Sequence, residues 1–266
     1  MNHFQEWAAW QRAAGLSPRT VEERAVTIAA LLASSGVEGH ELMPLHIATF
    51  LGREHLSQAS RATYYGAIRA YCRFLQAIGA RSDDPCALIP APRRRPSVPR
   101  PVSDAQLEGI LAACNRRRTR CYVLLAAYQG LRVHEVAKIR GEDIDIAAGT
   151  LRVVGKGARE AVLPLHPVIA REARQWPRAG YWFPGRTSAH VTGQGVGQAI
   201  QSAMTRAGVS GTPHMLRHWF GTRLVAEGVH LRVVQELMRH ASPTTTAGYT
   251  LVRPEQMRAG LERIAA

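Results

Sequence analysis

Residues 144–163 read IDIAAGTLRVVGKGAREAVL, and they break the helical periodicity that dominates the rest of the sequence. Three short segments rich in aliphatic and β-branched residues are separated by glycine-containing turns at residues 147–149 and 155–157. Consecutive short strands joined by tight turns pair as antiparallel neighbours. The stretch therefore predicts a small antiparallel sheet with strands at Ile144–Ile146, Thr150–Val154 and Glu160–Leu163.

Helical periodicity, with apolar residues three and four positions apart, flanks this sheet on both sides. Ser103 and Gln106 open the first of these helices with the spacing of a capping box. The expected helices cover residues 103–114, 119–129, 134–140, 167–176, 195–207, 213–227, 231–239 and 254–264. The second domain is therefore predicted to be mostly helical, with one small sheet.

The first 81 residues predict a separate four-helix domain, with periodic segments at residues 4–14, 21–32, 45–51 and 62–78. One face of its fourth helix carries residues at spacings of four, namely Arg61, Tyr65, Arg69 and Arg73. A basic stripe of this kind suits DNA binding through Arg61, Arg69 and Arg73. A solvated surface stripe is the more frequent meaning of the same spacing.

Proline marks the boundary between the two domains. Six of the fifteen prolines fall within residues 82–101, and this density cannot continue a helix or a central strand. We expect helical and mostly helical domains at 1–81 and 103–266, joined by an extended linker at 82–102. The linker is basic and is expected to contact DNA through Arg93, Arg94 and Arg95. A merely flexible tether would have the same composition.

Charge is distributed unevenly along the chain, which carries a formal net charge of +14 and a sequence pI near 10.7. Residues 1–90 hold eight bases and eight acids, so the whole excess lies in residues 91–266, with 26 bases and 12 acids. This balance makes a polyanion the expected partner. It argues against an acidic solvating tail and against an ordinary small-metabolite enzyme.

The sequence lacks the features of exported and membrane proteins. No apolar run approaches the roughly 20 residues that a membrane span requires, and no secretory signal pattern opens the chain. The four cysteines form no CxxC pair, which favours reduced, partly buried thiols over a disulfide framework or a zinc ribbon. We expect a cytoplasmic protein with no membrane partner.

Five polar signatures punctuate the second domain, and each also has a structural interpretation. Arg132 follows a glycine turn and Glu135 lies one helical turn further on, which is typical of an ion pair at a helix junction. Lys156 lies at the expected hairpin tip, where a lone lysine is ordinarily a solvated turn residue. An isolated helix-terminal His240 is usually a cap, and an isolated Tyr249 is usually half-buried.

The remaining signature is Thr212-Pro213-His214-Met215-Leu216-Arg217-His218. Thr212 suits the N-cap of a helix and Pro213 its first position, which places His214 and Arg217 on one face of the first turns and predicts a phosphate site. His214 and His218 also have the spacing of helical zinc ligands. No thiolate or carboxylate completes a ligand set, so we expect no metal and a satisfied core histidine at His218.

The order and spacing of these signatures together resemble the catalytic domain of the tyrosine recombinase (phage integrase) family, over roughly residues 100–250. Gln129-Gly130-Leu131-Arg132 matches the motif of the first catalytic arginine, and Glu135 matches its acidic partner. Lys156 matches the β-hairpin lysine. His214 and Arg217 match the HxLR box. His240 matches the histidine of the LGH box, and Tyr249 matches the nucleophile.

Three positions depart from the family pattern, although none removes a catalytic group. Gln129 stands where threonine is common, His134 where serine is common, and Arg239 where glycine usually precedes the histidine. Arg239 bears on the local turn and is a candidate for an additional phosphate contact. The helical domain before the linker resembles the family's core-binding domain in architecture and position.

The resemblance implies a transesterification that needs no metal, ATP or cofactor. Tyr249 would attack the scissile phosphate and form a 3′-phosphotyrosyl bond, leaving a free 5′-hydroxyl. Tyrosine ordinarily has a pKa near 10, so positive neighbours must favour its phenolate. The resemblance implies that Arg132, Arg217 and His240 neutralise the transition state and that Lys156 protonates the departing oxygen. It also implies that His214 assists proton traffic and that Glu135 orients Arg132.

Strand exchange between two duplex sites requires several protomers, and the family implies a homo-tetramer on synapsed DNA, with a monomer or dimer in its absence. Accessory DNA-bending or directionality proteins are further expected partners. Met257, Leu261 and Ile264 line one face of the expected last helix, which suits docking on a neighbour or on its own domain.

The leading hypothesis is a site-specific DNA recombinase of a phage or mobile element. A chromosome or plasmid dimer resolvase would use the same chemistry. A non-catalytic, sequence-specific DNA-binding protein of the same fold is a second alternative, against which the complete catalytic set argues. A relaxing topoisomerase, acting as a monomer without a specific site, is a third.

Overall fold

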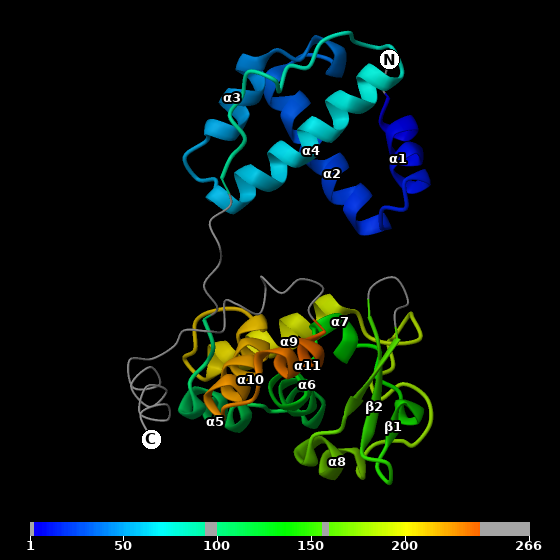
Figure 1. Cartoon of the computed structure of the whole chain (residues 1–266), viewed down its shortest axis with the longest axis vertical. Coiled ribbons are helices and arrows are strands. Elements are labelled where there is room, and N and C mark those ends of the chain that lie inside the picture. The colour runs from blue at the N-terminus through cyan, green and yellow to red at the C-terminus, as the bar shows by residue number, and fades with distance from the viewer. Residues whose placement is uncertain (1–2, 94–99, 156–159, 240–266) are drawn as a thin grey trace, which may run out of the picture. The chain divides into compact units, whose positions relative to one another are not determined.

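The computed structural model describes residues 3–93, 100–155 and 160–239, and the chain divides into two compact units, Met1–Pro96 and Ser97–Ala266 (Figure 1). Both units are largely helical in their described parts, and a small three-stranded antiparallel sheet lies in the second. The expected fold class is confirmed. Within the described ranges, no helix is both long and apolar enough to cross a membrane.

The described part of the first unit packs four α-helices and a short 3-10 turn around one core. Its elements are α1 (Phe4–Ala13), α2 (Pro18–Ser35), η1 (Gly39–Glu41), α3 (Pro44–Gly52) and α4 (Gln58–Ala77). The hydroxyls of Ser17 and Ser57 cap the two long helices by accepting from backbone amides three residues on. α2 and α4 pack on each other (Figure 1), and Trp7, Ile28 and Ile68 are fully buried in this core.

The first part of the proline-rich stretch, through Ile89, folds back onto this core. Cys86 is 1% exposed, and its amide donates to the Asp84 carboxylate at 2.9 Å. The Tyr65 hydroxyl donates to the carbonyls of Cys86 and Ile89 at 3.5 and 3.4 Å. Tyr65 therefore holds this segment in place. All four cysteines of the chain are free thiols, and Cys72, Cys86 and Cys121 are buried.

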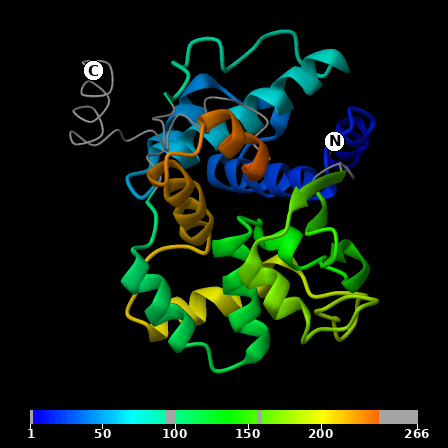
Figure 2. The ribbon, with the colours of Figure 1, turned by 60° about the horizontal axis from the view of Figure 1, so that its bottom comes forward.

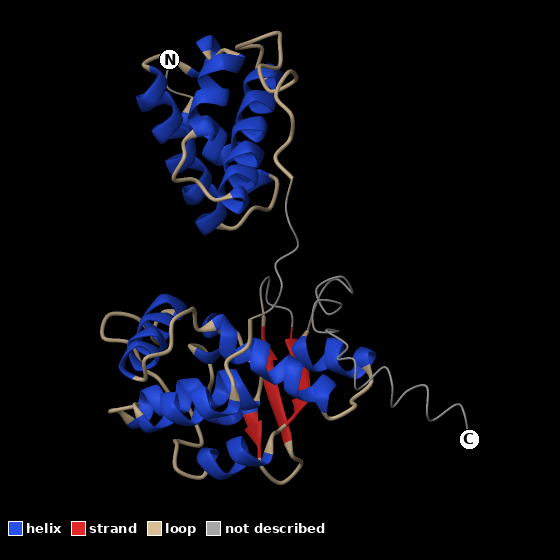
Figure 3. Cartoon of the chain, turned by 90° about the vertical axis from the view of Figure 1, so that its left-hand side faces the viewer, coloured by secondary structure: helices blue, strands red, loops and turns tan. Residues whose placement is uncertain are grey.

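The second unit places its sheet to one side of a group of helices in the view of Figure 1, and Figure 3 shows its strands in red. Its described elements are α5 (Asp104–Ala112), α6 (Arg117–Tyr128), α7 (Val133–Val136), η2 (Gly141–Asp143), β1 (Ile144–Asp145), β2 (Thr150–Val154), β3 (Glu160–Pro164), α8 (Pro167–Ala173), α9 (Gly193–Arg206), α10 (His214–Ala226) and α11 (Leu231–Met238). The capping box expected at Ser103 and Gln106 is present. Helix α6 forms the centre of the core, because Cys121–Ala127 are all buried, and α8, α9 and α10 pack around it.

The three strands pair in the order β1-β2-β3. The β2–β3 register runs from Thr150 opposite Pro164 to Val154 opposite Glu160. Leu151 and Val153 point into the core, as strand alternation requires. The expected hairpin on either side of residues 155–159 is thereby confirmed.

The helix expected at residues 134–140 is shorter than its periodicity predicts, because α7 ends at Val136. The chain then passes so close to its own backbone that a Cβ atom at Gly141 would lie 2.2 Å from the carbonyl of Pro177. The Gly141 amide donates to the Gly180 carbonyl at 2.9 Å. This close tertiary contact replaces the last helical turn that the sequence pattern favours.

Candidate active site

The turn before Arg132 requires glycine. Gly130 has a φ of +62°, and a Cβ atom there would lie 2.4 Å from the Phe220 ring. Both the left-handed backbone and the close approach exclude a side chain. Leu131 is buried in the core, and the side chain of Arg132, at the N-cap of α7, is 31% exposed. A rigid turn thus presents the Arg132 guanidinium at the surface.

Glu135 anchors that guanidinium from below. Its side chain is 1% exposed; Oε1 accepts from Arg132 Nη1 at 3.0 Å, and Oε2 accepts from the Arg132 backbone amide at 2.7 Å. A second guanidinium, that of Arg239, donates from Nη2 to Oε2 at 2.7 Å. Burial alone would raise the pKa of Glu135, but Arg239, the Arg132 amide and the charges of Arg132 and Arg217 hold that pKa below its usual value. Glu135 is therefore an ionised carboxylate between two arginines.

Arg217 is buried beside this pair and connects three segments. It lies one turn into α10 with 1% exposure, and its guanidinium donates from Nη1 to the Gly130 carbonyl and from Nη2 to the Met238 carbonyl. Met238 is the last residue of α11, which packs on α10 (Figure 2). The guanidinium thereby fixes the turn before Arg132 and the end of α11 to the start of α10.

His214 and His218 form a ring pair at the start of α10, with centroids 4.4 Å apart and an edge-on geometry. Desolvation and the charges of Arg217 and Arg132 lower the pKa of His214. Desolvation, His214 and Arg217 lower the pKa of His218 to about 4. At neutral pH both imidazoles are therefore uncharged.

The N-terminus of α10 differs from its expected form. The predicted side-chain cap by Thr212 is wrong, because Pro213 occupies the N-cap position and Thr212 accepts from the Met215 amide through its backbone carbonyl at 3.0 Å. No described side chain caps this end of the helix. The amides of Met215 and Leu216 donate to the carbonyls of Thr212 and Pro213 at 3.0 and 3.2 Å, so this end of the helix offers an anion chiefly the positive end of the helix dipole.

Arg239 follows α11 in the left-handed conformation, with φ 52° and ψ 48°. Among the described residues it is the one non-glycine position with a positive φ. Glycine is the preferred residue after a helix that ends in this way, which explains why the family favours glycine here. The Arg239 side chain is only 13% exposed and turns inward to Glu135. The Arg239 guanidinium therefore pairs with the buried carboxylate and does not point to the surface.

Gln129 joins the Arg132 turn to the sheet. The side chain is buried; Nε2 donates to the Pro164 carbonyl at 2.8 Å, and Oε1 accepts from the His166 amide at 2.9 Å. A threonine, with its single hydroxyl on a shorter side chain, could not span both partners. This departure from the family pattern therefore makes a structural connection of its own.

The predicted residues Lys156, His240, Tyr249, Arg94 and Arg95 lie outside the described part of the chain. The structure accordingly brings together Arg132, Glu135, His214 and Arg217 from the predicted site. It adds Arg239 to them.

The predicted DNA-binding arginines of the first unit fall into two groups. Arg61 is half-buried and donates from Nε to the Leu51 carbonyl at 2.9 Å and from Nη2 to the Arg53 carbonyl at 3.0 Å, which ties α4 to the end of α3. Arg69, Arg73 and Arg93 are exposed. The exposed three are free of the structural bonds that hold Arg61.

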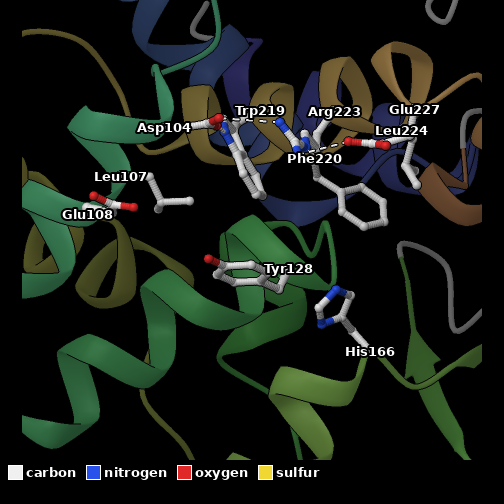
Figure 4. Close-up of a pocket in the computed structure, with 10 residues that line it drawn as sticks. All are labelled: Asp104, Leu107, Glu108, Tyr128, His166, Trp219, Phe220, Arg223, Leu224 and Glu227. Atoms are coloured by element: carbon white, nitrogen blue, oxygen red, sulfur yellow. Dashed lines mark hydrogen bonds and ion pairs between the residues drawn. The ribbon is translucent and has the colours of Figure 1, made fainter.

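A pocket of about 450 Å³ lies between α5, α6 and α10 (Figure 4). The rings of Tyr128 and Trp219 meet in it with centroids 5.3 Å apart, and Arg223 bridges Asp104 and Glu227 at its edge. None of the predicted catalytic residues lines this pocket. The arginine cluster, rather than this hollow, is therefore the candidate phosphate site. Within the described ranges, no three metal-ligating side chains are grouped to hold an ion.

Known proteins share this sequence pattern over most of its length. The sequence profile of the phage integrase family matches residues 101–256. The chain belongs to the phage integrase family. The tyrosine recombinase XerD of Caulobacter vibrioides is 30% identical over an alignment of 280 residues, gaps included. The alignment covers 96% of this chain and 92% of that protein.

Solved structures of phage integrases are similar as well. The integrase from mycobacterium phage Brujita is 46% identical and covers 98% of this chain and 91% of its own, with a TM-score of 0.54. A lambda integrase dimer bound to a core site is 18% identical, covers 94% of each chain and shares the fold with a TM-score of 0.76. The resemblance to tyrosine recombinases is thereby confirmed.

Two contributions to the site escape the motif analysis. They are the ion pair of Arg239 with Glu135 and the anchoring of the Arg132 turn by Gln129. Both residues stand where this chain departs from the family pattern. The signal was therefore visible in the sequence, but the partner of each side chain became visible only in the fold.

Proposed function

We propose that this member of the phage integrase family is a site-specific DNA recombinase that acts as an integrase, cutting and rejoining duplex DNA through Tyr249. The observation that carries the proposal is the convergence of Arg132 and Arg217 beside the N-terminus of α10. Two guanidiniums and a helix N-terminus suit the charge of a phosphodiester passing through a pentacoordinate transition state.

The proposed cleavage step conserves the phosphodiester energy. The Tyr249 phenolate forms a bond to phosphorus, the bond from phosphorus to the 5′-oxygen breaks, and Lys156 gives its proton to that oxygen. Arg132, Arg217 and His240 stabilise the charge on the non-bridging oxygens. Attack by a 5′-hydroxyl from a second duplex reverses the step and returns the proton, so no ATP or metal is consumed.

His214 receives the tyrosine proton in this scheme. Its pKa is lowered by desolvation and by Arg217 and Arg132, so the imidazole is neutral at physiological pH and has a lone pair to offer. Glu135 is a positioning residue, because its carboxylate contacts Arg132 rather than the surface. The exposed Arg69, Arg73 and Arg93, together with Arg94 and Arg95, are proposed to contact the DNA backbone.

Double-stranded DNA is the proposed substrate, and a homo-tetramer on two synapsed sites is the proposed active form, acting in the bacterial cytoplasm. The integrase role is supported by 46% identity to the Brujita phage integrase. The dimer-resolvase alternative is supported by relatives named XerD, which are about 30% identical. Related structures include a lambda integrase tetramer bound to a Holliday junction, which favours the tetramer.

The decisive experiment uses core sites selected by binding from a random duplex library. Each selected duplex is nicked beside the expected crossover, so that the cleaved strand diffuses away and the covalent intermediate accumulates. The wild-type chain should form an adduct on a denaturing gel, and Tyr249→Phe should form none while binding the same duplex. If the wild-type chain binds the sites but leaves no adduct on any nicked form, the enzyme proposal fails and the non-catalytic alternative stands.

A plasmid assay separates the two biological roles. Two different sites carried on separate plasmids report integration, and two identical sites repeated on one plasmid report resolution. An integrase should fuse the separate plasmids. Activity confined to the directly repeated sites would favour the resolvase.

A further inference from the structure

Arg239 adopts a backbone conformation that disfavours side chains, at a position where glycine would be unstrained. If the Arg239 side chain contributed nothing, replacing it with glycine would relieve the backbone and stabilise the protein. We therefore expect the side chain to have a function. The guanidinium donates from Nη2 to Glu135 Oε2 at 2.7 Å and from Nη1 to the Leu237 carbonyl at 3.3 Å, and the contact with the carboxylate is the shorter and the charged one. With 13% and 1% exposure the two side chains are largely shielded from water, so their attraction is little screened.

The contacts of Arg239 close a ring around Arg132. The side chain of Arg239 contacts Oε2 of Glu135, and Oε1 of the same carboxylate contacts Nη1 of Arg132. The backbone carbonyl of Arg239 accepts from Nη2 of Arg132 at 3.3 Å. Two nitrogens of the Arg132 guanidinium are therefore held by groups that Arg239 either supplies or orients.

Charge balance gives the same residue a second effect. A buried Glu135 with Arg132 as its only cation would cancel the charge that Arg132 offers to a phosphate. Arg239 compensates the carboxylate instead, so Arg132, Glu135 and Arg239 together keep one net positive charge. Among the groups that lower the pKa of Glu135 against the effect of burial, Arg239 has the largest influence.

We propose that Arg239 is a positioning residue for DNA cleavage, which acts through Glu135 to fix the direction of the Arg132 guanidinium and to preserve its charge. This inference rests on the proposed cleavage of DNA at Arg132. It gives a function to the residue that replaces the family's glycine.

The test compares Arg239→Gly, Arg239→Lys, Glu135→Gln and the double variant in single-turnover cleavage of a nicked core-site duplex at saturating protein. Arg239→Gly relieves the backbone and should fold. We expect it to lower the cleavage rate roughly tenfold, as for coupled residues of one network, while duplex affinity changes less than about twofold. Arg239→Lys should recover part of the rate. Arg232→Ala, which removes an exposed ion pair on α11, is the matched control and should keep the wild-type rate.

Two further readouts separate positioning from a merely structural role. The effect of Arg239→Gly should largely disappear in the Glu135→Gln background, since both act on the same guanidinium. Loss of Arg239 also raises the pKa of Glu135, so the rate deficit should grow as pH falls from about 7 to about 5.5. The groups facing Glu135 are Arg132 and His134 from its own turn, Arg217 from α10 and Arg239, and of these His134 is the one with an ordinary pKa near this range. A His134→Gln background should therefore leave the pH effect in place.

An Arg239→Gly rate equal to wild type, or an equal loss with and without Glu135, would overturn this inference alone. Absence of any adduct from the wild-type chain would overturn the proposed function and this inference with it.

Discussion

Arginine serves different purposes in the two units of the molecule. In the first unit, Arg61 ties α4 to two backbone carbonyls at the end of α3, while Arg69 and Arg73 further along the same helix are exposed. In the second unit, three arginines meet around one buried carboxylate and the end of α11. The difference teaches that a count of charges indicates a polyanion partner, whereas the convergence of arginines around a buried acid indicates a candidate site.

Replacing Arg217 by alanine should have the largest effect on the arginine cluster of the second unit. The Gly130 and Met238 carbonyls would lose a buried donor, so the free energy of unfolding should fall by about 3 kcal/mol. The cleavage rate should fall by about a thousandfold, because a cation at the phosphate is lost. Urea unfolding and single-turnover adduct formation measure the two effects. Arg217→Lys keeps a charge without the two-point contact, and a rate near wild type for it would show that the guanidinium fork is dispensable.

Glu135→Gln tests the same cluster through pH. The folded-state pKa of Glu135 is held below its usual value of 4.5, so the stability contributed by the carboxylate is present above about pH 4.5 and lost as pH falls below it. The variant should be about 1–3 kcal/mol less stable than wild type at pH 7. That gap should narrow when urea unfolding is repeated at pH 4 and below. A gap independent of pH would mean that the carboxylate's charge contributes nothing.

Single alanine substitutions in α4 test whether the arginines of the first unit stabilise the fold or bind DNA. Arg61→Ala should lower the free energy of unfolding by about 1 kcal/mol through its two lost hydrogen bonds. Arg69→Ala and Arg73→Ala should leave stability unchanged. Each should reduce the slope of log affinity against log salt by about one, as for a lost phosphate contact. Filter binding across a salt series measures the slope. An unchanged slope would mean that both residues are solvated surface residues that do not contact DNA.

The smallest expected effect is that of EDTA on cleavage. Because arginines supply the positive charge in the proposed mechanism, adduct yield on the nicked duplex should stay within experimental error after chelation. A loss that Mg²⁺ restores would contradict the proposed mechanism.

Periodicity and turn chemistry predicted most of the fold. Ser103 caps a helix where the pattern places it, and the strands on either side of residues 155–159 pair as the two turns indicate. The end of α7 could not be predicted, because the contact of Gly141 with the Pro177 carbonyl is set by a segment far along the chain. Local propensity contains no information about such contacts.

Motif spacing likewise found Arg132, Glu135, His214 and Arg217, whose proximity follows from the family pattern. It did not find the partner of Arg239. A side chain at the end of α11 can point outward to DNA or inward to Glu135, and only the packing of α11 on α10 decides between them. The cap at Thr212 failed for a related reason, since Pro213 rather than Thr212 occupies the N-cap position.

The Gln129 side chain makes two hydrogen bonds, one to the Pro164 carbonyl and one to the His166 amide, and together they have a mechanical consequence. They pin the hairpin at Pro164, the end of β3 that adjoins the Arg132 turn, while the chain toward Lys156 leaves from the opposite end of the strand. Any shift of β3 relative to the Arg132 turn must therefore break one of these two hydrogen bonds.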